Sequence, residues 1–159
     1  MQIRPMRESD LDEVAEIEKE NFSVPWKKED FSGYIDFAYA IFLTAEEDGK
    51  VAGYIGAIVT DEEGDIVNVS VRPDRMGAGL GTALVRCLLH ETDGRGIARV
   101  FLEVRESNER AIRLYEAAGF RQVGIRKDYY QKPTEDALLM RRDLGAGLSQ
   151  TRRNGFGKE

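Results

Sequence analysis

The chain has 159 residues, the usual length of a single domain, and its 42% hydrophobic and 33% charged residues support an ordinary core and exclude a largely disordered protein. Its net charge of −6 argues against a general nucleic-acid binder and favours a positively charged partner, such as a basic peptide. The single cysteine excludes an internal disulfide, no apolar run is long enough to span a membrane, and the first residues lack the apolar segment of a signal peptide, so we expect a cytoplasmic protein.

The first half of the chain predicts a strand, two helices and three further strands. Ser9 is an N-cap candidate, and Asp12, three residues later, completes a capping-box pattern. Pro25 ends the helix that follows, because proline lacks the amide hydrogen that an inner helical turn needs. The expected elements are a strand at 2–6, a helix between Ser9 and Ser23, a short helix at 27–35, and strands at 39–45, 50–60 and 65–71.

The second half predicts two helices that alternate with strands. Leu80, Leu84 and Leu88 recur at helical spacing, and this helix ends near Gly94. Gly119 stands where a glycine commonly ends a helix. The expected elements are a helix at 80–94, a strand at 100–104, a helix at 108–118, and strands at 120–125 and 137–141.

This order mixes hairpins with helical crossovers, so it predicts an α/β fold of three layers (α+β in arrangement). We expect a mixed, mostly antiparallel central sheet with helices on both faces. Neither an internal repeat nor a linker divides the chain, which indicates one domain over residues 1–144. Residues 145–159 are rich in Gly, Ser, Gln, Arg and Asn, and we expect them to form a disordered tail.

A glycine-rich loop lies between the strand at 65–71 and the helix at 80–94. Gly77, Gly79 and Gly81 let the backbone approach a ligand closely, and the helix that follows offers unpaired N–H groups to phosphate oxygens. The lysine of an ATP-binding P-loop is missing, and the G-x-G-x-G spacing differs from the dinucleotide fingerprint. The sequence therefore predicts a site for another phosphate-bearing ligand, with a flexible turn as the alternative.

Two motifs resemble the GNAT superfamily of N-acetyltransferases. The first is Asn-Val-Ser-Val-Arg-Pro-Asp at 68–74 with Gly-Leu-Gly-Thr-Ala-Leu at 79–84, and the second covers 102–120. Three further stretches, at 22–26, 126–130 and 135–140, are similar to the RimI branch of that superfamily, the ribosomal-protein-alanine N-acetyltransferases. The resemblance covers about residues 2–142 and implies the GNAT fold and acetyl coenzyme A as co-substrate. No cluster of Cys and His residues suggests a metal, so we expect none.

The resemblance also implies which residues bind coenzyme A. They are Gly77, Ala78, Gly79, Leu80, Gly81 and Thr82 in the loop, Val69, Ser70 and Val71 through their backbone, and Asn108. The loop departs from the family pattern, because Met76 and Gly77 stand where polar or basic side chains are usual. This departure leaves the pyrophosphate to the backbone N–H groups, and Arg72 and Arg75 are the nearest cations that could compensate. Asn108 is alternatively a helix N-cap.

Glu103 and Tyr115 are the catalytic candidates. Glu103 lies in an otherwise apolar strand, where burial would raise its pKa and suit a general base. Its alternative is a strand-end glutamate that faces solvent or pairs with Arg105 or Arg121. Tyr115 lies seven residues after Asn108 on one helix face, and the resemblance implies that it protonates the leaving thiolate. Its alternative is a core aromatic residue.

The acceptor slot is expected to involve Trp26, Tyr129 and Tyr130. Alternatively, Trp26 and Phe22 attach the second helix to the core. The resemblance implies a protein N-terminus as acceptor, namely the N-terminal alanine of a small-subunit ribosomal protein. We expect no nucleic acid or membrane partner, and a monomer or weak dimer. The rival functions are a small-molecule amine acetyltransferase and a non-catalytic acetyl-coenzyme-A-binding module.

Overall fold

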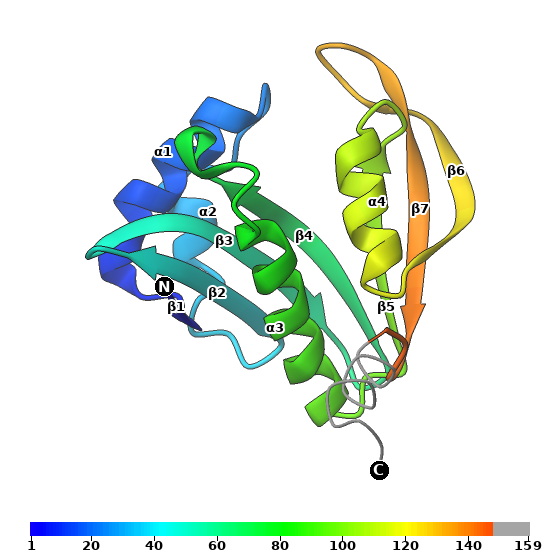
Figure 1. Ribbon diagram of the computed structural model, residues 1–159, viewed down its shortest axis with the longest axis horizontal. Coiled ribbons are helices and arrows are strands. Elements are labelled where there is room, and N and C mark those ends of the chain that lie inside the picture. Colours follow the sequence, from blue (N-terminus) through cyan, green and yellow to red (C-terminus); the bar gives the residue numbers. More distant parts are fainter. Residues whose placement is uncertain (148–159) are drawn as a thin grey trace.

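The computed structural model describes residues 1–147, which form one seven-stranded sheet in the order β1-β2-β3-β4-β5-β7-β6 (Figure 1). Every neighbouring pair is antiparallel except β4 and β5, which are parallel. The elements are β1 (Gln2–Pro5), α1 (Leu11–Asn21), α2 (Lys28–Ser32), β2 (Ala40–Glu47), β3 (Lys50–Val59), β4 (Glu63–Val71), α3 (Leu80–Gly94), β5 (Arg99–Arg105), α4 (Glu109–Ala117), β6 (Arg121–Tyr130) and β7 (Glu135–Asp143). The predicted mixed, mostly antiparallel sheet is confirmed.

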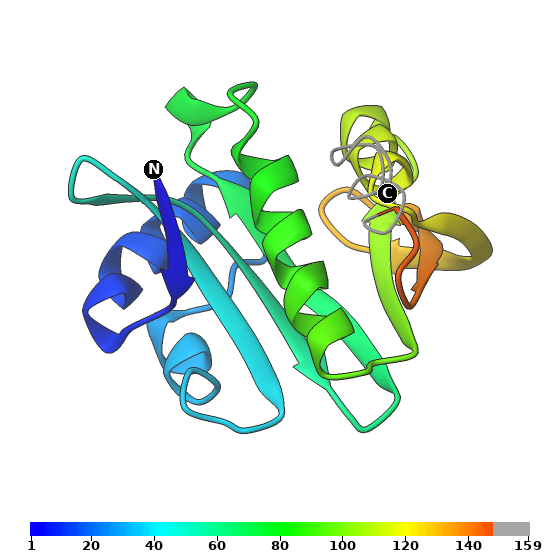
Figure 2. The same cartoon turned by 60° about the horizontal axis from the view of Figure 1, so that its bottom comes forward.

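Helices cover both faces of the sheet, as expected, and each face has its own core (Figure 2). Leucines of α3 and Tyr115 of α4 pack on one face, against buried residues of β3 and β5. Leu11 and Val14 of α1 and Phe31 of α2 pack on the other face, against Tyr54. None of the helices in the described part of the chain is long and apolar enough to cross a membrane.

The start of α1 differs from the predicted capping box at Ser9 and Asp12. A short 3-10 turn, Glu8–Asp10, precedes the helix, and the carboxylate of Asp10 accepts the backbone N–H of Arg7 at 2.8 Å. Asp10 is held there by Arg4, whose buried guanidinium donates to both of its oxygens at 2.8 and 2.9 Å. Asp12 pairs with Lys28 of α2 at 3.0 Å instead. Arg4 of β1 also binds Glu46 of β2, so its position is set by the sheet. The start of the helix therefore depends on strand pairing, which local sequence spacing does not reveal.

The last two strands are longer than predicted. β6 was expected to end at Ile125, but it continues to Tyr130, where that residue pairs with Glu135 of β7. The register is irregular between Arg126 and Tyr130, so the apolar alternation that marks a strand is lost there. The hairpin partner β7 sustains the strand, since it pairs on its other side with β5 over seven residue positions from Arg99 to Arg105. In contrast, α2 is shorter than the predicted helix at 27–35.

The predicted disordered tail begins at Gly145, and only its first three residues fall within the described chain. Gly145 donates its N–H to Asp93 of α3 at 3.3 Å, and the carbonyl of Ala146 accepts Arg142 Nε at 2.7 Å. These bonds attach the end of β7 to the end of α3. Residues 148–159, which contain the rest of the predicted tail, lie outside the described residues.

We expect Gly56→Ala to destabilise the fold by about 1–3 kcal/mol, because it overpacks the core between β3 and α2. An added Cβ at Gly56 would lie 2.1 Å from Cε2 of Phe42, whose ring packs against Phe31 and Tyr34 and cannot withdraw freely. Urea unfolding of both proteins measures the difference. Gly94→Ala is the matched control, because nothing lies within 4 Å of a Cβ at that position. Equal stability of the two variants would contradict the packing argument.

Candidate active site

The strands β4 and β5 pair only at one end and then separate. Their ladder consists of Glu63–Arg99, Gly64–Val100 and Asp65–Phe101, and beyond Asp65 the two strands diverge (Figure 1). Residues 66–71 of β4 and 102–105 of β5 therefore each have an edge without a strand partner in the described chain. Backbone groups on such edges are available to the amides or carbonyls of a ligand. Val69, Ser70 and Val71, which the sequence predicts as backbone contacts, lie on this part of β4.

The side chains of Val69, Ser70 and Val71 pack or form hydrogen bonds within the protein. Val69 and Val71 pack against the core beneath α3, while Ser70 is buried and its hydroxyl accepts a hydrogen bond from the side-chain amide of Asn21. The same Asn21 amide donates to the carbonyl of Val71 at 2.8 Å. Asn21 of α1 therefore fixes the end of β4, and the edge of β4 that faces β5 remains free.

The glycine loop leads directly into α3. Gly77 and Gly79 have φ of +84° and +87°, a backbone conformation that favours glycine, and Gly79 is the N-cap of α3. Within the described chain no acceptor binds the backbone N–H groups of residues 77–82. These donors lie at the positive end of a 15-residue helix, an arrangement that suits phosphate oxygens.

Gly81 has a different role from the other two loop glycines. It lies inside the first turn of α3, and an added Cβ there would lie 3.2 Å from Cδ1 of Leu114 on α4. Its lack of a side chain therefore permits close packing of α3 against α4. This packing role is additional to the approach of a ligand, which the sequence argument predicted for all three glycines.

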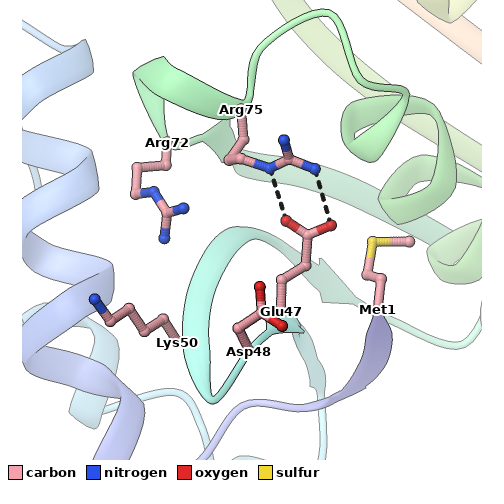
Figure 3. A pocket seen from close by; sticks show the side chains of 6 residues that line it. All are labelled: Met1, Glu47, Asp48, Lys50, Arg72 and Arg75. Atoms are coloured by element: carbon pink, nitrogen blue, oxygen red, sulfur yellow. Dashed lines mark hydrogen bonds and ion pairs between the residues drawn. The ribbon is translucent and has the colours of Figure 1, made fainter.

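Arg72 and Arg75 do not compensate for the missing cation of the loop. Arg75 binds both oxygens of Glu47 at 2.7 and 3.1 Å, and this ion pair holds the pKa of Glu47 below its usual range (Figure 3). Arg72 donates to Asp74 at 2.6 Å and to the carbonyl of Val51 at 3.1 Å. Both arginines line a polar surface pocket of about 440 Å³ beside the β2–β3 hairpin, together with Met1, Glu47, Asp48 and Lys50. None of the residues of the glycine loop lines this pocket.

Arg110 of α4 is the cation that does reach the loop, and the sequence argument missed it. Its Nη2 atom lies 3.0 Å from the position that a Cβ of Gly77 would take. The signal in the sequence was its position in the first turn of α4, two residues after the cap. That signal could be interpreted only once α4 was known to lie beside the loop.

Glu103 lies on the open face of β5, just beyond the point where β4 and β5 separate. Along β5 the buried Val100, Leu102 and Val104 alternate with partly exposed residues, and Glu103 is one of the latter. Its Oε2 accepts Arg126 Nε of β6 at 2.9 Å. The expectation of a buried carboxylate without a partner is therefore wrong, and the ion-pair alternative holds with Arg126 as partner.

The two partners that the alternative named are engaged elsewhere. Arg105 binds Glu135 at 3.1 Å, and Arg121 binds Asp143 at 3.2 Å. Asp65 of β4 lies close enough to Glu103 to respond to its charge: desolvation of the carboxyl group, and then the Glu103 carboxylate, raise the pKa of Asp65. Two carboxylates and one guanidinium thus occupy the mouth of the opening between β4 and β5.

Tyr115 is 7% exposed and packs against Phe120 at a centroid distance of 5.8 Å. Its ring thus fills the core, as the alternative interpretation has it. Burial, with a smaller contribution from Tyr130, raises the pKa of the Tyr115 phenol. Its hydroxyl has no hydrogen-bond partner among residues 1–147. The group is therefore protonated at neutral pH, which is the form that a proton donor requires.

The remaining predicted cofactor residue, Asn108, caps α4. Its side-chain oxygen accepts the backbone N–H of Ala111 at 3.2 Å, so the N-cap interpretation is confirmed. The cap positions the first turn of α4, which also carries Arg110.

The three predicted acceptor residues separate into two groups. Tyr129 and Tyr130 are at the end of β6 with perpendicular rings 5.1 Å apart, and the guanidinium of Arg105 lies 4.5 Å from the ring centre of Tyr130. Burial, followed by the neighbouring Tyr129 and Glu103, raises the pKa of Tyr130 to about 12. Because Tyr130 also affects Tyr115, the end of β6 lies near both catalytic candidates.

Trp26 belongs to the other core. It stacks on Tyr34 at 5.7 Å and packs against Phe31 at 5.2 Å, which is the attachment of α2 that the sequence left as an alternative. Phe22, the second member of that alternative, is largely exposed.

A buried polar network beneath the loop between α1 and α2 was also missed. Glu18 is 3% exposed and accepts the backbone N–H of Trp26 at 3.0 Å, the Tyr54 hydroxyl, and the Asn68 amide at 3.4 Å. The sequence signal was weak, because Glu18 is surrounded by other charged residues. It lies one turn after the buried Val14, however, and so falls on the inner face of α1. The network connects this loop to β4.

Comparison with known proteins assigns this arrangement to a family. The sequence pattern of the acetyltransferase (GNAT) family matches residues 11–120. The chain belongs to the GNAT acetyltransferase family. The predicted family and its fold are thereby confirmed. GNAT enzymes use acetyl coenzyme A, and the unpaired loop donors and the free strand edges described above suit such a ligand. Within residues 1–147, no group of three or more His, Cys, Asp or Glu side chains could hold a metal ion.

Individual GNAT proteins resemble the chain over most of its length. The Escherichia coli (strain K12) ribosomal protein bS18-alanine N-acetyltransferase is 37% identical over 142 residues, which are 87% of this chain and 94% of that protein. A Bacillus subtilis (strain 168) protein, named provisionally for the same activity, is 39% identical over 139 residues, or 87% and 92% of the two chains. The crystal structure of the Escherichia coli ribosomal-protein-S18-alanine N-acetyltransferase superposes with a TM-score of 0.83 at 33% identity, covering 90% of this chain and 93% of that one.

Proposed function

We propose that this protein transfers the acetyl group of acetyl coenzyme A to the N-terminal α-amino group of a cytoplasmic protein, and that its acceptor is the N-terminal alanine of ribosomal protein bS18. The observation that carries the proposal is the opening between β4 and β5, with Glu103 at its mouth and the end of β6 beside it. The named activity of the relatives, which match most of the chain, supports the choice of acceptor.

The residues of the site suit the proton transfers that this reaction needs. The α-amino group, with a pKa near 7.7–8.0, must lose a proton as its nitrogen bonds to the acetyl carbonyl carbon. Glu103 takes that proton, since its carboxylate lies at the mouth of the opening. Tyr115 donates its own proton to the sulfur as the carbon–sulfur bond breaks. The free backbone N–H groups on the β4 edge stabilise the negative charge that develops on the carbonyl oxygen.

The acceptor slot is proposed to lie along Tyr129 and Tyr130. Tyr129 is exposed and lies near the carboxylates of Glu103 and Asp65, and Tyr130 lies near Glu103. Aromatic side chains offer rigid apolar area to a peptide backbone, while the carboxylates attract its positively charged terminus. Trp26 contributes indirectly, by fixing the loop between α1 and α2 through its contact with Glu18.

We expect peptides that begin with the first residues of bS18 to be acetylated on their α-amino group when they are incubated with the enzyme and acetyl coenzyme A. Tandem mass spectrometry identifies the modified nitrogen. The control peptide has the same sequence with a blocked N-terminus, and it should remain unmodified even where it contains lysine. A panel of polyamines and free amino acids serves as the competing acceptor class. Acetylation of these amines alone would refute the proposed acceptor, and coenzyme A binding with no acetylation would favour a non-catalytic module.

A further inference from the structure

The space above Gly77 is occupied by the guanidinium of Arg110. Nη2 lies 3.0 Å from where a Cβ of Gly77 would be, so the side chain of α4 extends over the loop that precedes α3. Gly77 has φ of +84°, and a residue with a side chain there would be strained and would also press against Arg110. The absence of a side chain at Gly77 therefore leaves space for the guanidinium of Arg110, which places a positive charge of α4 above the loop.

Arg110 has no anionic partner within the part of the chain that the structure describes. The nearest acidic residue in sequence, Glu109, pairs with Arg113 at 3.8 Å instead. Arg110 is exposed, and it lies in the first turn of α4 beside the N-terminal end of α3. A cation is unfavourable at the positive end of a helix, so the free protein gains no electrostatic stabilisation from this position. A bound anion would make the electrostatic energy of Arg110 at this position favourable.

Among residues 1–147, the cations nearest in sequence to the glycine loop are bound elsewhere. Residues 76–82 carry no charged side chain, and Arg72 and Arg75 are bound to Asp74 and Glu47 on the other side. Backbone N–H groups can orient phosphate oxygens, but they contribute only partial charge to a ligand that carries two adjacent phosphates.

We infer that Arg110 binds the diphosphate of acetyl coenzyme A across the glycine loop and supplies the charge that the loop itself lacks. The inference rests on the proposed function only in taking acetyl coenzyme A as the co-substrate. Arg110 bonds to phosphate oxygens from the α4 side, while the N–H groups of residues 77–82 bond from the α3 side. The diphosphate is then held between two helix N-terminal ends.

The experiment measures coenzyme A binding to the wild-type chain and to Arg110→Gln, Arg110→Lys and Arg113→Gln by isothermal titration calorimetry. We expect Arg110→Gln to raise the Kd roughly 10- to 100-fold, the range for loss of a hydrogen bond to a charged group. Arg110→Lys should retain part of the affinity, because it keeps the charge but loses the planar fork. Arg113→Gln, one turn away and also exposed, should change the Kd less than about 2-fold.

Two further readouts separate diphosphate binding from other roles. The loss should be as large with 3′-dephospho-coenzyme A and absent with pantetheine, which has no phosphate. Without ligand, Arg110→Gln should unfold at the same temperature as wild type or higher, since it removes an unfavourable charge. With saturating acetyl coenzyme A and a peptide acceptor, kcat should stay within about 2-fold while the KM for acetyl coenzyme A rises.

An unchanged Kd for Arg110→Gln would overturn the inference, and so would a loss that disappears with 3′-dephospho-coenzyme A, which would assign Arg110 to the ribose phosphate. The acceptor proposal fails separately. Arg110-dependent binding of coenzyme A by a protein that acetylates no peptide would support the inference and refute the proposed acceptor.

Discussion

Glu103→Gln and Tyr115→Phe are each expected to lower kcat by about 10²-fold or more at saturating acetyl coenzyme A and peptide, because each removes one of the two proton transfers. Both changes preserve shape. Glutamine can still accept Arg126 at the mouth of the β4–β5 opening, and phenylalanine keeps the ring that packs against Phe120. The rate is measured as release of free coenzyme A thiol, and urea unfolding verifies that each variant is as stable as wild type.

Glu106→Gln is the matched control, since Glu106 is exposed and follows β5 directly. It should retain the wild-type rate. If either active-site variant also retains that rate, the corresponding acid–base assignment is wrong. If both retain it while the peptide is still acetylated, the reaction proceeds by positioning alone, with the solvent exchanging the protons.

Arg142→Met is expected to destabilise the fold by about 1.5–3 kcal/mol at neutral pH, because it removes two charge-assisted hydrogen bonds from the partly buried carboxylate of Asp93. Arg142 is 1% exposed and donates to both oxygens of Asp93 at 2.8 and 3.0 Å. It also bonds to the carbonyl of Ala146, so it joins the end of α3 to the segment after β7. Urea unfolding of wild type, Arg142→Met, Asp93→Asn and the double variant gives the coupling between the two residues.

The effect of Arg142→Met should depend on pH in a defined direction. Burial acts to raise the pKa of Asp93, but the hydrogen bonds and charge of Arg142 outweigh it and hold that pKa below its usual value. A carboxyl group with a lowered pKa in the folded state stabilises the fold above its unfolded pKa of about 3.9 and loses this contribution as pH falls further. The difference between wild type and Arg142→Met should therefore be constant from pH 7 to 5 and shrink below about pH 4.

Arg121→Met provides the control for this pair, since Arg121 forms an exposed ion pair with Asp143 at 3.2 Å. It should change the stability by less than about 1 kcal/mol. An Arg142→Met variant that behaves like Arg121→Met, or a double variant that shows no coupling, would mean that the pair contributes nothing specific.

Local spacing was sufficient for the parts of the site that lie close together in the sequence. The loop before α3, the cap at Asn108 and the helix that carries Tyr115 all depend on neighbours within a few residues, and the resemblance identified what such a loop binds. The same local rules misplaced the start of α1, because Asp10 responds to a strand residue, and shortened β6, because its last residues are held only by β7.

The sequence by itself thus determined the family, the mixed sheet and the positions of Glu103, Tyr115 and the glycine loop, since periodicity and motif spacing are properties of contiguous residues. Only the tertiary structure decided what each of these residues contacts. It placed Arg126 on Glu103, turned Arg75 away to Glu47, gave Gly81 to the packing of α3 on α4, and positioned Arg110 above Gly77. These contacts join elements that are distant along the chain, and their geometry follows from strand order and helix packing, which no local pattern encodes.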